Sequence, residues 1–336
     1  MKILFNPLMP IDLNMANMVS DYQSDMIFHG LVKNLGKNVH TDYDLWWHHK
    51  SEKEKNPQRF REIWGKGFTM YGLLDKEEYT YGSSDDVNTY DAVVIPIHHT
   101  MNKQDAYLKN LLDFFIEAGY EKNQLIVIDG WDQEYINQDL AGLCTYYKRE
   151  MKDHHEEHAY PISFAMPKEK IRQLDDSKRN AAFAPLIPVN QSIDPSYMST
   201  YIYDTEESYY DMYQTAYFSY TSKKGGWDTL RHYEIIANGS IPFFVDIENC
   251  PKYTLWDFPK EDLLQARKIL GGRPNLIGET WRGQSLPHCG VIAKENPGSL
   301  EDFHKSLWQH YRDNLYSWLN ESATTEALAD YVLGKI

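Results

Sequence analysis

The feature that most limits the fold of this chain is an alternation of short β-branched runs with amphipathic stretches. The run Asp91–Ile97 (DAVVIPI) is typical of a buried strand, and so is Gln124–Ile128 (QLIVI). Between them, Lys103–Ala118 carries apolar residues at helical spacing, namely Leu108, Leu111, Leu112, Phe115 and Ile116. Strands that alternate with helices predict a parallel sheet with helical crossovers.

The N-terminal segment follows the same pattern. Lys2–Leu8 is predicted to be a first strand. Val19–Leu35 is predicted to be a helix that ends at Gly36, with Ser20 or Asp21 as its N-cap.

The alternation returns in the second half of the chain. A short strand is predicted at Ile162–Met166, between Pro161 and Pro167. Further strands are predicted at Ala181–Pro188, Thr215–Tyr220 and Ile241–Asp246, a helix at Thr229–Asn238, and helices from Asp302 to the end.

We therefore predict an α/β fold with two Rossmann-like domains and a C-terminal helical tail. The 336 residues suffice for two domains of about 150 residues each. The expected boundaries are 1–160, 161–318 and 319–336. The helix Thr324–Leu333 is expected to cross back and pack on the first domain.

Composition excludes several classes of partner. The formal net charge of −15 argues against nucleic acid, whose binding requires positive charge. No run approaches the roughly 18 apolar residues of a membrane span, so none is expected. Three scattered cysteines fit neither a disulfide framework nor a zinc motif. With no signal-peptide pattern at the N-terminus, we expect a cytoplasmic protein.

The most informative segment is Ser222–Asp246 (SKKGGWDTLRHYEIIANGSIPFFVD). Gly225 and Gly226 allow close backbone approach before the predicted helix, and Asp228 is expected to be its N-cap. A glycine-rich turn that leads into a helix N-terminus is suited to binding an anion. Such a segment is a candidate site for a diphosphate.

Charged residues of this segment are placed to complete such a site. Lys223 and Lys224 lie just before the glycines, and Arg231 and Glu234 fall on one face of the predicted helix. Gly239 is expected to end that helix in a left-handed conformation. We therefore expect the two lysines and Gly226 near a diphosphate, with Glu234 accepting a ribose hydroxyl.

The pattern Arg231-x-x-Glu234-x-x-x-x-Gly239-x-Ile241-Pro242 resembles the donor-binding motif of GT-B glycosyltransferases, most nearly the exostosin-like group. The close match covers about 30 residues, and beyond it the likeness is one of architecture. The resemblance implies that Arg231 binds the donor phosphate and Glu234 the donor ribose. It also implies a UDP- or GDP-sugar donor, a glycan or small-molecule acceptor, and no permanently bound cofactor or metal.

The resemblance also bears on stereochemistry. Many retaining GT-B enzymes carry a second glutamate seven residues before the first, where this chain has Trp227. We therefore expect an inverting transfer.

Inversion requires a general base, which we expect in the N-terminal domain. The candidates are Asp21, Asp25, His98, His99, Asp129 and Asp132, of which Asp25 is preferred, then His98, then Asp129. For each one taken singly, helix capping or loop solvation is the better interpretation. Lys148 and Arg149 are candidates for the donor phosphates, with a solvated basic pair as an equal alternative.

Two histidine pairs are interpreted without a metal. His154 and His158 have i, i+4 spacing, but they lie in a highly charged stretch that we expect to be solvated. His48 and His49 are expected to line the acceptor side.

Two other functions stay open. A different nucleotide-using α/β enzyme is disfavoured because Asn6–Asn17, the first expected βα turn, contains no glycine. A non-catalytic nucleotide-sugar-binding module would keep Arg231 and Glu234 and would need no base.

Overall fold

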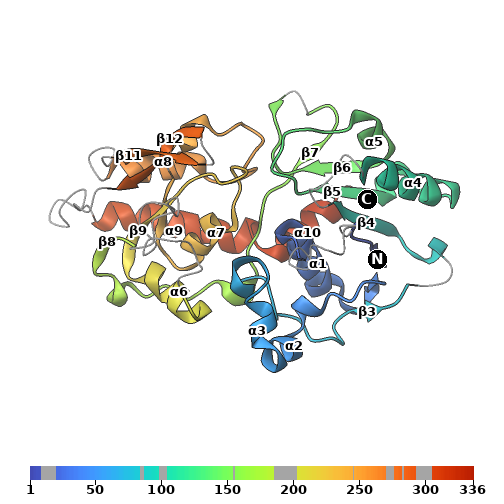
Figure 1. The fold of residues 1–336 in the computed structure, drawn as a ribbon, viewed down its shortest axis with the longest axis horizontal. Helices are drawn as coiled ribbons and strands as arrows, with labels where there is room; N and C mark the ends of the chain where they lie inside the picture. The colour runs from blue at the N-terminus through green and yellow to red at the C-terminus, as the bar shows by residue number, and fades with distance from the viewer. Residues whose placement is uncertain are drawn as a thin grey trace.

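The computed structural model describes residues 1–8, 20–83, 87–97, 104–153, 156–184, 203–244, 246–269, 276–281, 284–292 and 305–336. Figure 1 shows strands β3 to β7 in one half of the molecule and β8, β9, β11 and β12 in the other. We call residues 1–161 the N-terminal half and residues 162–322 the C-terminal half. The helix α9 (Lys305–Ser322) leads from the second half back to α10 (Thr325–Leu333) beside the first.

The N-terminal half is built on a seven-stranded parallel sheet with the strand order β3-β2-β1-β4-β5-β6-β7. The strands are β1 (Ile3–Phe5), β2 (Val39–Thr41), β3 (Thr80–Tyr81), β4 (Ala92–Ile97), β5 (Leu125–Asp129), β6 (Thr145–Lys148) and β7 (Tyr160–Pro161). The order reverses direction between β1 and β4, which is the switch point of a doubly wound sheet. The expectation of an α/β fold with a parallel sheet is confirmed.

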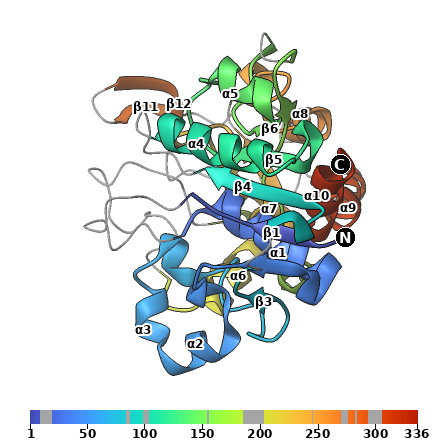
Figure 2. The same cartoon turned by 90° about the vertical axis from the view of Figure 1, so that its right-hand side faces the viewer.

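Helices cover both faces of this sheet because its strands are apolar on both sides. Val94 and Ile126 face the core that contains α1 (Tyr22–Leu35) and α10. Their chain neighbours Val93 and Val127 point to the other face, into the core beneath α4 (Gln104–Glu117) and α5 (Gln138–Leu143). Figure 2 shows α4 and α5 on the opposite side of β4 from α1.

The C-terminal half contains a three-stranded parallel sheet with the order β10-β9-β8. Its elements are β8 (Ala181–Phe183), α6 (Glu206–Gln214), β9 (Ala216–Thr221), α7 (Leu230–Ala237), β10 (Ile241–Phe244), α8 (Lys260–Lys268) and an antiparallel hairpin of β11 (Leu276–Trp281) and β12 (Gln284–Ile292). One continuous apolar core joins this half to the first, since it includes Phe5 and Ile27 as well as Tyr209 and Phe243.

The long helix α1 begins and ends as its sequence indicates. Asp21 is its N-cap and accepts a hydrogen bond from the Ser24 amide at 2.9 Å. Gly36 ends it with a φ of 56°, in the left-handed region that glycine tolerates. In its centre, Gly30 lets the backbone of α10 come close, because a Cβ there would overlap the carbonyl group of Thr325. His29 adds a 2.8 Å hydrogen bond between its Nδ1 and the Thr325 hydroxyl.

One sequence expectation needs correction. Ile162–Met166 does not add a strand to either sheet; β7 ends at Pro161, and Met166 instead makes an isolated bridge with Thr324. The segment between β2 and β3 contains the short helices α2 (Lys50–Lys55) and α3 (Pro57–Phe60). Residues 185–188 of the expected strand Ala181–Pro188 lie outside the described residues.

Of the helices that the structure describes, none combines the length and apolar character that a bilayer-spanning helix needs.

We expect Gly30→Ala to destabilise the protein by about 1–3 kcal/mol, since overpacking against the α10 backbone outweighs the helix preference of alanine. Gly142→Ala in α5 is the control, because a Cβ there meets nothing within 4 Å. It should stabilise the protein by about 0.5–1 kcal/mol. Chemical denaturation of both variants measures the difference. Effects of the same sign at the two positions would contradict the close approach of α10.

Candidate active site

A pocket of about 270 Å³ lies between the carboxyl ends of strands from both sheets. The N-terminal half contributes the residues that follow β5 and β6 and the start of α1. The C-terminal half contributes the turn between β9 and α7. The carboxyl ends of parallel strands are where α/β proteins bind ligands.

The pocket brings together many of the residues singled out in the sequence. Those among its lining residues are Asp21, Asp132, Arg149, Lys224, Gly226, Arg231 and Glu234. The other lining residues are Tyr22, Trp64, Gly65, Gly130, Phe164, Gly225, Asp228, Thr229 and Leu230.

The two glycines before α7 are required by close approach across the halves. A Cβ at Gly225 would overlap the Asp132 carboxylate, and a Cβ at Gly226 would overlap that of Glu150. A side chain at either position would therefore require the facing carboxylate or the turn itself to shift.

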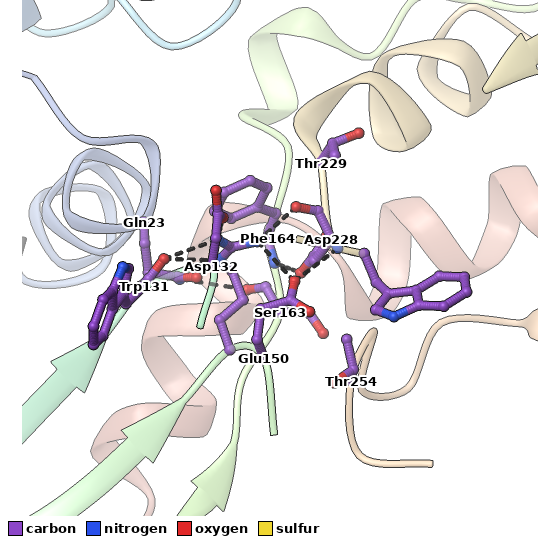
Figure 3. A network of polar contacts seen from close by, with 12 residues as sticks. Gln23, Trp131, Asp132, Glu150, Ser163, Phe164, Asp228, Thr229 and Thr254 are labelled. Carbon is purple, nitrogen blue, oxygen red and sulfur yellow. Dashed lines mark hydrogen bonds and ion pairs between the residues drawn. The ribbon is translucent and has the colours of Figure 1, made fainter. Parts of the chain in front are cut away.

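Asp228 has a different role from the one expected. The N-cap residue of α7 is Thr229, which makes no side-chain capping bond. The Asp228 carboxylate instead accepts a 2.7 Å hydrogen bond from the Phe164 amide, on the segment that connects the halves (Figure 3). Its Oδ1 is buried without a hydrogen-bond partner in the described part of the chain. Burial raises the pKa of Asp228 to about 7, against the opposing influence of Arg149.

The guanidinium of Arg149 makes hydrogen bonds to residues of both halves at the pocket. Its five N–H groups are matched by five hydrogen bonds. Two go to the Gly130 carbonyl, at 3.1 and 2.8 Å, and one to the Asp132 carboxylate. The others reach the Glu150 carboxylate at 3.1 Å and, across the halves, the Asp228 carbonyl at 2.6 Å. Arg149 thus lines the pocket, but its donors are already engaged by protein groups.

Lys148 and Asp129 bind each other. Their ammonium and carboxylate lie 3.0 Å apart, and both residues are buried. Asp129 also accepts hydrogen bonds from the Tyr146 hydroxyl at 2.7 Å and the Trp131 amide at 2.9 Å. Neither residue lines the pocket, so the structure places the expected phosphate ligand Lys148 and the expected base Asp129 in a buried ion pair.

Glu234 is held in a fixed position at the pocket wall. Its two carboxylate oxygens accept hydrogen bonds from the Thr69 hydroxyl at 2.5 Å and the Tyr209 hydroxyl at 2.6 Å. Burial raises its pKa, while these hydroxyls and Arg231 act in the opposite direction. Thr69 has a φ of 63°, which is costly for a β-branched residue, so the surrounding contacts hold it there.

Arg231 and Lys224 supply positive charge beside Glu234. The buried Nε of Arg231 has no hydrogen-bond partner among the described residues. The Arg231 guanidinium lowers the pKa of Lys224 to about 7. Lys224 is exposed as a whole residue, yet burial of its ammonium end adds to this shift. Lys223 lies outside the pocket lining, with its ammonium 4.8 Å from the centre of the Trp227 ring.

The remaining expected residues lie elsewhere. Asp25 is buried and accepts hydrogen bonds from Trp47 at 2.7 Å and, at 3.0 Å, contacts His48. His48 and His49 are therefore core residues and do not line the pocket; His49 contacts the Tyr79 hydroxyl at 2.9 Å. His98 and His99 lie outside the described residues.

Several lining residues were missed as site candidates, and Asp228 and Trp64 illustrate why. Asp228 lies in the segment Ser222–Asp246, but an aspartate just before a helix is typical of an N-cap, and we predicted that role for it. Trp64 is 44% exposed at the pocket, beside Gly65. Nothing in its sequence neighbourhood distinguishes it from the other tryptophans, because its position depends on contacts distant in sequence.

Within the described residues, no group of three or more His, Cys, Asp and Glu side chains is arranged to hold a metal ion. Comparison of the chain with protein-family models, curated proteins and solved structures gave no match. The chemistry of the pocket is therefore the basis for assigning a function.

Proposed function

We propose that this protein is a glycosyltransferase of the GT-B type that transfers a sugar from a nucleoside-diphosphate sugar to a hydroxyl acceptor, with inversion. One observation carries the proposal: Lys224, Arg231 and Glu234 meet in a pocket between the carboxyl ends of strands from two parallel sheets. An arginine and a lysine that can carry positive charge, beside one buried carboxylate, match the charges and hydroxyls of a nucleoside diphosphate.

The diphosphate would bind to Lys224 and Arg231, next to the N-terminus of α7. Thr229 and Leu230 at that N-terminus also line the pocket, and a helix N-terminus favours negative charge. Arg149 is left out of this role because its five donors are engaged. The neighbouring Glu234 would accept a ribose hydroxyl, since each of its oxygens has a second lone pair.

Asp21 is the proposed base. It and Asp132 are the carboxylates that the described N-terminal half contributes to the pocket, and Asp132 is paired with Arg149. Asp21 would take the proton of the acceptor hydroxyl while its oxygen attacks the anomeric carbon. The bond from that carbon to the diphosphate oxygen breaks, and its electron pair leaves with the nucleoside diphosphate. Lys224 and Arg231 would stabilise the charge that develops there.

We expect Arg231→Met and Glu234→Gln each to weaken donor binding about tenfold or more, because each removes a charged hydrogen-bonding partner. A thermal-shift screen with UDP-, GDP-, CMP- and ADP-sugars identifies the donor, and calorimetry then measures its affinity. Lys223→Met is the matched control, since it removes a cation outside the pocket and should leave affinity unchanged. Equal affinities for all three variants would refute the donor site.

We expect the protein to take up a proton at Lys224 when the donor diphosphate binds. In the free protein its pKa is lowered to about 7, so above pH 7 it is mostly neutral. A bound diphosphate stabilises the charged form and raises this pKa, so at pH 8 binding should take up close to one proton. Below about pH 6 the group is already charged, and the uptake should vanish. Calorimetry in buffers of different ionisation enthalpy measures it, with Lys224→Met as the comparison. The same uptake in that variant would exclude Lys224 as its source.

Asp21→Asn should lower turnover by roughly 10²–10⁴ and leave donor affinity unchanged. Asparagine is an equally good N-cap, so α1 is preserved. Turnover and the anomeric configuration of the product, read by NMR, provide the measurement. Full activity of the variant, or retained configuration, would show that the mechanism is wrong. Donor binding without transfer to any acceptor would favour the non-catalytic module.

A further inference from the structure

We infer that the protein has a second ligand site, a pocket lined by aromatic rings that binds a small organic cation such as a methylated ammonium group. This pocket has a volume of about 250 Å³; it shares Phe164 with the first pocket but is not lined by the turn before α7. The inference does not rest on the proposed transferase activity.

The pocket lies where the two halves are connected. Residues Ser163–Ala165 come from the first connecting segment. Ser322 is the last residue of α9, and Ala323 lies between α9 and α10. The remaining lining residues are Trp256, Asp257 and Trp318 from the C-terminal half, and Ala327, Leu328 and Tyr331 from α10.

Aromatic residues dominate the wall. Trp256 is 38% exposed, and its ring stacks on Tyr253 with centroids 6.0 Å apart. Trp318 packs beside Tyr233 at 6.0 Å and beside Phe258 at 5.0 Å, measured between ring centroids. Each indole therefore packs against at least one further aromatic ring while it lines the pocket. Electron-rich ring faces attract cations, and tryptophan does so most strongly.

The turn that carries Trp256 is held in a costly conformation. Leu255 and Asp257, on either side of it, have φ values of 50° and 59°. The left-handed region is unfavourable for a bulky residue such as leucine, and such strain concentrates at ligand sites. This turn places the exposed residues Trp256 and Asp257 at the pocket.

The charge and hydrogen bonding of the wall select the ligand class. Among the described lining residues, Asp257 is the one Asp, Glu, Lys, Arg or His side chain, so the wall carries a single negative charge. Asp257 accepts a hydrogen bond from the Trp318 indole N–H at 3.4 Å, Ser163 donates to the Trp256 carbonyl at 3.0 Å, and Tyr331 donates to the Pro161 carbonyl at 2.9 Å. A sugar needs several hydrogen-bonding partners, whereas a methylated cation needs ring faces and one carboxylate.

The test compares choline with its uncharged isostere 3,3-dimethylbutan-1-ol, using the full chain and calorimetry or tryptophan fluorescence. Choline should bind about threefold to thirtyfold more tightly, because the two differ in charge alone. Asp257→Asn should remove most of this preference, and asparagine tolerates the same left-handed φ. Trp256→Leu should weaken choline binding more than binding of the isostere.

Asp262→Asn in α8 is the matched control, since it removes an acidic charge outside the pocket and should leave choline binding unchanged. Thermal unfolding confirms that each variant is folded. Equal binding of choline and the isostere, absence of saturable choline binding, or tighter binding of methyl glucoside would each overturn the inference. None of these outcomes bears on Lys224, Arg231 or the donor.

Discussion

The guanidinium of Arg149 is the contact on which the rest of the site depends. It follows β6 of the first sheet directly and reaches the Asp228 carbonyl in the turn before α7. Because Arg149 is rigid, planar and fully hydrogen-bonded, it sets the separation of the two strand ends between which the pocket opens. The shared apolar core fixes the halves elsewhere, but Arg149 determines the geometry at the pocket itself.

Local sequence signals predicted the elements that position the site. The β-branched runs of β4 and β5, the limits of α1 from Asp21 to Gly36, and the left-handed Gly239 after α7 all follow from neighbouring residues. The anion-site pattern before α7 was also sufficient to select Lys224, Arg231 and Glu234, which the structure brings into one pocket. The elements were predictable because turn chemistry and helical spacing are decided within a few residues, whereas the ligand of the pocket stays a prediction.

The partners of charged residues were not predictable in the same way. Lys148 and Arg149 are adjacent and looked equivalent, yet the first points into a buried ion pair and the second across the pocket. Successive residues at a strand end face opposite sides of a sheet. The side chains that they contact on each side belong to segments distant in sequence. Asp25 shows the same effect, because Trp47 and His48 come from a region without any regular pattern.

The close contacts around Arg149 also limit which substitutions this sequence can tolerate. Arg149 without its acidic partners would leave a buried positive charge, and Glu150 without Arg149 would leave a buried negative charge. A side chain at Gly225 or Gly226 would collide with those same acids. A tolerated change at one of these five positions (132, 149, 150, 225 and 226) therefore requires compensating changes at others. In distant descendants of this chain, they should be kept together or replaced together.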